Sequence, residues 1–152
     1  MRNIRSLLEQ SIERSSEDTS VAVLLSGGVD SMSVSLSAEN IGKKVHAYSF
    51  HLDTHLSYDF KKVKEISDKF GWDFTEISIP TKQLISDFKK LVRMGCKNKS
   101  SYECTYPFLY VYPKIKENEV ITGWGADGYY GNNRKAIQHY RNICHLSLKQ
   151  HN

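Results

Sequence analysis

The sequence predicts a doubly wound α/β fold, in which helices cover both faces of a parallel sheet. Apolar segments rich in β-branched residues alternate with amphipathic helical segments. The run at residues 21–25 is apolar throughout, which is typical of a central strand covered on both faces. Strands that alternate with helices pair in parallel through right-handed crossovers. We expect residues 1–152 to form one such domain, short at its C-terminus.

Three elements are expected around and after that first strand. Apolar residues at helical spacing predict an opening helix around residues 4–12. A second helix is expected over residues 32–40, where Gly42 can end it. Residues 45–50 contain aromatic and β-branched side chains and predict the second strand.

The second half of the chain repeats the alternation less regularly. A helix over residues 60–70 precedes an alternating strand over residues 75–79. Thr81 can cap the next helix. The buried stripe of that helix is expected to contain Leu84, Phe88, Leu91 and Val92. A short helix near Pro107, a strand over residues 120–122 and a largely helical remainder complete the expected fold.

The composition fits one globular domain in the cytoplasm. The 152 residues are 39% hydrophobic and 25% charged. The net charge of +4 suits a phosphate ligand, but it is small for a nucleic-acid-binding protein. No apolar run reaches the roughly 20 residues needed to span a bilayer, and no signal peptide is evident. Cys96, Cys104 and Cys144 form neither a CxxC pair nor a disulfide framework, so we expect reduced thiols.

The hexapeptide Ser-Gly-Gly-Val-Asp-Ser at residues 26–31 lies between the first strand and the following helix. Ligands bind there in α/β proteins, at the carboxyl ends of the strands. Gly27 and Gly28 let the backbone approach an anion closely, and the N–H groups at the helix start point toward it. Ser26 and Ser31 add hydroxyl donors. The loop therefore predicts a phosphate site.

Asp30 indicates that the phosphate is bound together with a cation. A carboxylate repels a bare phosphate, whereas a divalent ion can bridge the two, and magnesium is the natural candidate. The alternative is a tight turn in which Asp30 and Ser31 cap the helix. No GxxxxGK[ST] pattern occurs, which disfavours binding of the kinase or GTPase type.

A second motif, Gly-Trp-Gly-Ala-Asp-Gly at residues 123–128, follows the strand over residues 120–122. It satisfies the GxGxxG pattern of dinucleotide-binding proteins. Such a site also needs an acidic residue about 20 positions later, and no Asp or Glu follows Asp127. The motif is therefore not a dinucleotide fingerprint.

The two motifs, in this order, resemble those of the PP-loop, or N-type, ATP pyrophosphatases. The second is similar to the Gly-Glu-Gly-Ala-Asp-Glu motif of the asparagine synthetase-like branch. The resemblance covers about residues 20–131 and implies an adenine nucleotide alpha hydrolase-like, Rossmann-like fold that binds ATP and magnesium. The family enzymes also carry an N-terminal glutaminase domain, and we expect a synthetase domain without it.

The resemblance also implies roles for individual residues. The adenine and ribose of ATP would contact Leu25, Leu52, Thr122 and Gly123. The pyrophosphate part would contact Ser26, Gly27, Gly28 and Ser31. Asp30 and Asp127 would share the magnesium ion, and the expected catalytic set is Ser26, Asp30, Ser31 and Asp127.

The sequence departs from the family in its second motif and after it. The family's catalytic glutamate is Trp124 here, and the glutamate after the aspartate is Gly128. An indole cannot accept a proton from an attacking amine. Only 25 residues follow Asp127, so the helical region that forms the acceptor pocket is expected to be short. These departures disfavour asparagine synthesis but leave the phosphate-binding residues intact.

We therefore expect an AMP-forming ligase that adenylates a small-molecule or RNA acceptor and releases pyrophosphate. One alternative is a tRNA or nucleobase sulfurtransferase that uses Cys96 or Cys104, whose surroundings are basic. Another is a nucleotide-binding protein without turnover, or a fragment that needs a partner to complete its pocket. A partner subunit could also supply ammonia. No membrane association is expected.

Three further groups of residues have a functional and a structural interpretation. His51, Asp53 and His55 could hold a metal, although such loops are more often solvated surface. The basic tail could bind pyrophosphate or RNA, or form a solvated helical face; it contains Arg134, Lys135, Arg141 and Lys149. Five tyrosines could form a stacking wall but are expected mainly in the core or at its rim: Tyr106, Tyr110, Tyr112, Tyr129 and Tyr130.

Overall fold

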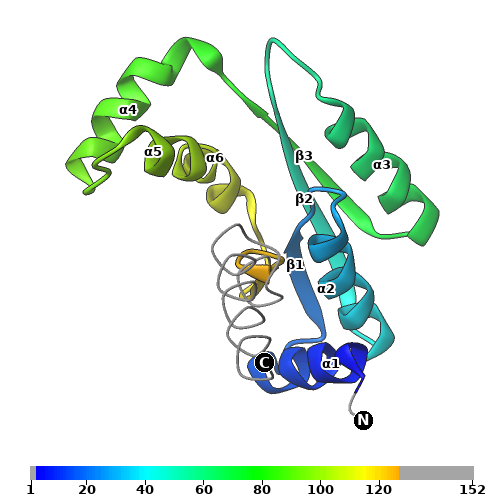
Figure 1. The fold of residues 1–152 in the computed structure, drawn as a ribbon. Helices are drawn as coiled ribbons and strands as arrows, with labels where there is room; N and C mark the ends of the chain where they lie inside the picture. The colour runs from blue at the N-terminus through cyan, green and yellow to red at the C-terminus, as the bar shows by residue number, and fades with distance from the viewer. Residues whose placement is uncertain (1–2, 127–152) are drawn as a thin grey trace, which may run out of the picture. The chain divides into compact units, whose positions relative to one another are not determined.

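A parallel four-stranded sheet lies between the helices that connect its strands (Figure 1). The computed structural model describes residues 3–126. The strands are β1 (Ser20–Leu24), β2 (Lys44–Leu52), β3 (Asp73–Ile79) and β4 (Val120–Thr122). They lie in the order β3-β2-β1-β4, and every neighbouring pair is parallel. The doubly wound parallel sheet predicted from the sequence is confirmed.

Six α-helices connect or precede these strands within the described residues. They are α1 (Ile4–Ser15), α2 (Val29–Asn40), α3 (Tyr58–Phe70), α4 (Leu84–Arg93), α5 (Lys99–Thr105) and α6 (Phe108–Val111). Two 3-10 turns, η1 (Thr81–Gln83) and η2 (Tyr112–Lys114), flank the later helices. None of the helices in this part of the chain could cross a membrane.

The two faces of the sheet carry separate apolar cores, and the helices divide accordingly (Figure 1). The α2-side core contains Ile12, Val21, Val23, Leu25, Ala38, Val45, Ala47, Val63 and Trp72. The α6-side core contains Ala22, Tyr48, Ile77, Ile79, Leu91, Tyr106 and Val111. Successive residues of β1 alternate between the two cores, as the pleat of a strand covered on both faces requires.

Local signals explain where several helices begin and end. The hydroxyl of Ser57 accepts a hydrogen bond from the Phe60 N–H at 3.1 Å and so caps α3. Gly71 then ends α3 in the left-handed conformation, with φ of +68°. Gly42 follows α2 with φ of +83°, as predicted. The short helix predicted near Pro107 is α6.

The segment after β3 differs from the prediction. Thr81 does not cap α4; its N–H and hydroxyl donate to the Asp53 carboxylate at 3.1 and 2.8 Å. In the predicted buried stripe only Leu91 is buried, whereas Leu84, Phe88 and Val92 are 37–47% exposed. A helical apolar pattern shows which side chains share a face, but not how much of that face another element covers.

The chain divides into two compact units at the end of β4. The first comprises residues 1–122, and the second comprises residues 123–152. Of the second unit only residues 123–126 are described, where the Ala126 N–H donates to the Gly123 carbonyl at 3.3 Å. The predicted helical tail, its basic residues, Cys144, Tyr129 and Tyr130 lie outside the described residues.

Candidate functional site

The loop over residues 25–28 follows the carboxyl end of β1. At this strand the strand order reverses, which makes it the topological switch point of the sheet. β2 flanks β1 on one side and β4 on the other. The chain passes from β1 through α2 to β2 along one face, and it returns to β4 from the opposite face (Figure 1). In open α/β sheets, ligands bind in the crevice at such a switch point. The predicted phosphate loop occupies this position.

Gly27 gives the loop its tight curve. Its φ of +73° belongs to the left-handed region that favours glycine. A Cβ atom there would lie 3.3 Å from Cγ2 of the buried Val63, so α3 packs directly against the loop backbone. Both the conformation and the contact require a residue without a side chain.

The hydroxyls of Ser26 and Ser31 meet across the loop, with their oxygens 3.1 Å apart. The Ser31 hydroxyl also accepts from the Ser26 N–H at 3.2 Å and donates to the Gly28 carbonyl at 3.1 Å. Because a hydroxyl has one proton, Ser26 must donate in the bond between the two hydroxyls. Ser31 is 4% exposed and fixes the loop, whereas Ser26 is exposed.

The first turn of α2 presents unpaired N–H groups to this loop. Gly28 is the N-cap residue and has no side chain to cap the helix. The Met32 N–H makes the first intrahelical bond, to the Gly28 carbonyl at 3.0 Å, so the N–H groups of residues 29–31 have no partner within the helix. These groups and the helix dipole favour an anion. The Ser31 hydroxyl binds the loop rather than these N–H groups, which argues against a simple capped turn.

Asp30 lies in the first turn of α2 and is partly exposed. In residues 3–126 no group of three or more His, Cys, Asp or Glu side chains could hold a metal ion. A lone carboxylate nevertheless fits magnesium, which usually binds through one or two carboxylates, water and substrate phosphates. Asp127, the second expected metal ligand, lies outside the described residues.

Lys62 is a member of the loop environment that the sequence interpretation missed. Its Nζ donates to the Gly27 carbonyl at 3.0 Å. The sequence carries no local signal of this contact, because it joins residues 35 positions apart.

The residues expected to contact adenine and ribose lie at the carboxyl ends of three strands. Thr122 ends β4 beside Leu24, next to the start of the loop. Leu25 is 2% exposed and packs in the α2-side core, so its side chain anchors the start of the loop to that core. Leu52 lies four residues beyond the β2 partner of Leu24, about 13 Å further along that strand. Gly123 belongs to the second unit.

His51, Asp53 and His55 do not form a metal cluster. The Nε2 atom of His51 lies 2.8 Å from a Glu76 carboxylate oxygen. Asp53 instead binds Thr81, and these hydrogen bonds hold the pKa of the Asp53 carboxyl below its ordinary value. His55 is exposed. The interpretation as a polar surface loop is supported.

Within residues 3–126, both cysteines and the tyrosines predicted at the core or rim lie on the α6 side of the sheet. Cys96 and Cys104 are free thiols; Cys96 is partly buried and Cys104 is exposed. Tyr106 is buried in the α6-side core, and Tyr110 donates to Asp87 at 2.5 Å. Tyr112 is 53% exposed. These tyrosines are core and rim residues rather than a stacking wall.

A second polar cluster, the His46 cluster, lies in the amino-terminal half of the sheet. It consists of His46, Tyr48, Thr75 and Glu117. His46 Nδ1 lies 2.6 Å from a Glu117 oxygen, and His46 Nε2 lies 2.7 Å from the Thr75 hydroxyl. The Tyr48 hydroxyl donates to the other Glu117 oxygen at 2.7 Å.

The His46 cluster shifts the pKa values of two of its members. Burial and the bond to Glu117 raise the pKa of Tyr48 to about 12. For Glu117, burial raises the pKa, but hydrogen bonds from Tyr48 and His46 outweigh it and lower the pKa below its ordinary value. Every polar atom at the centre of this cluster has a partner within it.

The fold and the loop define an α/β protein with a candidate anion site at the switch point of its sheet. A family model described as asparagine synthase matches residues 3–144. The chain therefore belongs to the asparagine synthase family, within the PP-loop superfamily of ATP-using synthetases.

Individual relatives agree with this family. The carboxyethyl-arginine beta-lactam-synthase of Streptomyces clavuligerus is 27% identical over 128 residues, covering 82% of this chain and 25% of that protein. The NMN synthetase of Francisella tularensis matches with a TM-score of 0.53 and 17% identity, over 78% of this chain and 49% of that one. The NH3-dependent NAD synthetase of Campylobacter jejuni matches with a TM-score of 0.51 and 13% identity, over 78% and 51%. The two solved structures support the fold. The chain spans about a quarter of the curated relative and about half of each synthetase.

Proposed function

We propose that the chain binds Mg-ATP at residues 26–31 and serves an AMP-forming ligase reaction. The observation that carries this proposal is the loop itself. Two serine hydroxyls, a left-handed glycine and an uncapped helix start converge at the switch point of the sheet. These groups suit an anion with several oxygens, such as the pyrophosphate part of ATP. Membership of a family of ATP-using synthetases supports the same ligand.

In the proposed reaction an acceptor oxygen attacks the α-phosphorus of ATP. The bond from that phosphorus to the bridging oxygen breaks, and pyrophosphate leaves with the electron pair. The N–H groups of residues 29–31 and the Ser26 hydroxyl hold the leaving group, while Ser31 keeps the loop in shape. Asp30 and Asp127 would hold magnesium, which supplies positive charge to the phosphate oxygens. Catalysis then rests on positioning and charge neutralisation.

The acceptor and the second half-reaction are also part of the proposal. In this proposal the loop binds only the nucleotide, so the acceptor is a separate molecule. We infer that it is a small molecule or an RNA. An amine or ammonia, supplied by a partner subunit, would then displace AMP from the adenylated acceptor. The sulfurtransferase alternative gains no support from Cys96, whose thiol donates to the Asn98 carbonyl.

Titration calorimetry with Mg-ATP and product analysis with α-labelled ATP test the proposal. We expect ATP to bind, and AMP rather than ADP to form when candidate acids and ammonia are added. Asp30→Ala should weaken ATP binding in magnesium, whereas Asp59→Ala is a matched control in the first turn of α3. ADP as the product would contradict the reaction. Equal ATP affinity of Asp30→Ala and the wild type would contradict the site.

A further inference from the structure

Lys62 is the one charged side chain bonded to the phosphate loop from another helix, within residues 3–126. The inference drawn from it rests on the proposed ATP site and extends it. Lys62 belongs to α3, whose next residue, Val63, is fully buried against the loop. The helix therefore holds the base of the lysine side chain in a fixed place beside Gly27.

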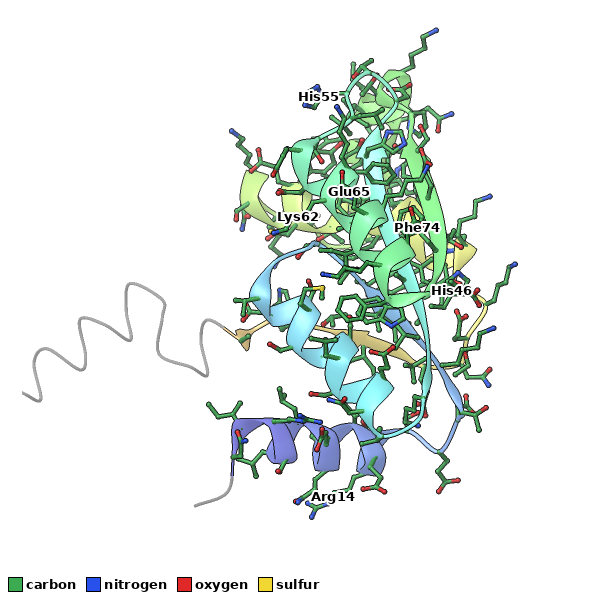
Figure 2. All side chains as sticks on the ribbon, turned by 90° about the vertical axis from the view of Figure 1, so that its right-hand side faces the viewer. Arg14, His46, His55, Lys62, Glu65 and Phe74 are labelled. Carbon is green, nitrogen blue, oxygen red and sulfur yellow. The ribbon has the colours of Figure 1, made fainter. Side chains whose placement is uncertain are left out.

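The aliphatic part of Lys62 crosses directly over the loop backbone. A Cβ atom built on Gly27 would lie 3.6 Å from Lys62 Cδ and 3.8 Å from its Cγ. The ammonium group then reaches the Gly27 carbonyl at 3.0 Å. Figure 2 shows Lys62 projecting from α3 beside the loop that leads into α2. The charge is therefore held at Gly27, two residues before the first N–H group of the helix start.

In the described part of the chain, Lys62 is bonded to a neutral group, the Gly27 carbonyl, rather than to a carboxylate. No carboxylate of residues 3–126 lies within 4.0 Å of its Nζ atom, although other lysines and arginines there do form ion pairs. An ammonium has three N–H donors, and the Gly27 carbonyl uses one. Unpaired N–H groups of α2 add further positive potential at the same place. This concentration of donors and charge, with only Asp30 opposing it in the first turn of α2, favours a polyanion.

We propose that Lys62 is a ligand of the β- and γ-phosphates of ATP and of the pyrophosphate that leaves. Its ammonium moves from the Gly27 carbonyl to a phosphate oxygen when the nucleotide binds. Because AMP carries no β-phosphate, Lys62 discriminates between ATP and AMP. The same contact neutralises charge that develops on pyrophosphate as it departs.

Calorimetric titration of Mg-ATP, magnesium pyrophosphate and AMP tests the role of Lys62. Hydrogen bonds between charged groups are strong enough that Lys62→Gln should weaken ATP and pyrophosphate binding by about ten- to a hundredfold. AMP affinity should stay within about twofold, because AMP does not reach Lys62. Lys62→Arg should recover most of the loss, since it restores the charge. Lys64→Gln removes the same charge from an exposed position on α3 and should behave like the wild type.

The outcomes separate this inference from the proposed function. If wild-type protein does not bind Mg-ATP, the proposed function fails and the role of Lys62 fails with it. If the wild type binds ATP and Lys62→Gln binds it equally well, only the role of Lys62 is overturned. If Lys62 had a purely structural role, Lys62→Gln would lower the Tm of the ligand-free protein and weaken the binding of AMP as much as that of ATP. That result would also overturn the proposal.

Discussion

The two ends of the sheet both gather polar groups, but they use them differently. At the carboxyl end of β1, the N–H groups of residues 29–31 have no partner within their helix, and the ammonium of Lys62 is bonded to the neutral Gly27 carbonyl. In the amino-terminal half, the His46 cluster pairs each of its polar atoms within the protein. A closed network stabilises a fold, whereas an excess of donors needs a ligand to complete it. This difference in hydrogen-bond pairing supports the proposed binding site at one end of the sheet and a structural role for the cluster at the other.

Among substitutions that change the shape of the loop, the largest expected effect comes from Gly27→Ala. The new Cβ would strain a residue at φ +73° and press on Val63, so we expect ATP affinity to fall about tenfold or more. Gly42→Ala is the matched control, because Gly42 has φ +83° and open space around it. Both should lose about 1–2 kcal/mol of stability from backbone strain. Calorimetry and urea unfolding check this, and equal ATP affinity of the two variants would contradict it.

A smaller effect is expected from Ser31→Ala, which removes the hydroxyl that joins Ser26 and Gly28. The variant should lose about 1 kcal/mol of stability, the typical net contribution of an intramolecular hydrogen bond, because the exposed partners Ser26 and Gly28 can bind water instead. ATP affinity should fall several-fold as the loop loosens. Ser33→Ala is the control, since its hydroxyl bonds only to the Val29 carbonyl on the exposed side of α2. Urea unfolding with and without Mg-ATP measures both effects. If Ser31→Ala and Ser33→Ala had the same stability and the same ATP affinity, Ser31 would not stabilise the loop.

At the closed end the expected effect is on stability and its pH dependence. The pKa of Tyr48 is raised from 10.0 to about 12, so its contribution is complete below pH 10 and is lost as the pH rises toward 12. The lowered pKa of Glu117 gives the opposite sign: its contribution is present above pH 4.5 and is lost as the pH falls further. Urea midpoints measured against pH should show both decreases.

Tyr48→Phe tests which end of the sheet these groups serve. The variant should show a shallower alkaline decrease in stability than the wild type, although Tyr110, with a pKa of about 12, still contributes. Tyr58→Phe is the control, because Tyr58 is 81% exposed. ATP affinity at neutral pH should be the same in all three proteins. A loss of ATP affinity in Tyr48→Phe would break the distinction between the open and the closed end.

The sequence predicted the strands and the position of the loop over residues 26–31 well, because their signals are local. The apolar run at residues 21–25 and the glycines after it require no knowledge of distant residues. The order of the motifs then identified the family, which the family match confirms. The expected roles of Ser26, Asp30 and Ser31 follow from the same local pattern and stay predictions.

The features that the sequence did not predict depend on distant contacts. Lys62 reaches Gly27 across 35 positions, and Glu117 reaches His46 across 71. No periodicity carries such information. The prediction of a fully buried apolar stripe on α4 was wrong for the same reason, since a helical pattern does not show which other element covers that face. Thr81 was expected to cap α4, but Asp53, 28 residues earlier, binds it instead.

The strand order has a consequence for how the chain folds. β1 pairs with β2, which follows closely, and with β4, which the chain reaches only after residue 119. Until β4 docks, one edge of the most apolar strand is unpaired and open to other chains. Such long-range pairing closes late and slowly. The extent of aggregation during refolding should therefore depend on how fast the three residues of β4, Val120, Ile121 and Thr122, pair with β1.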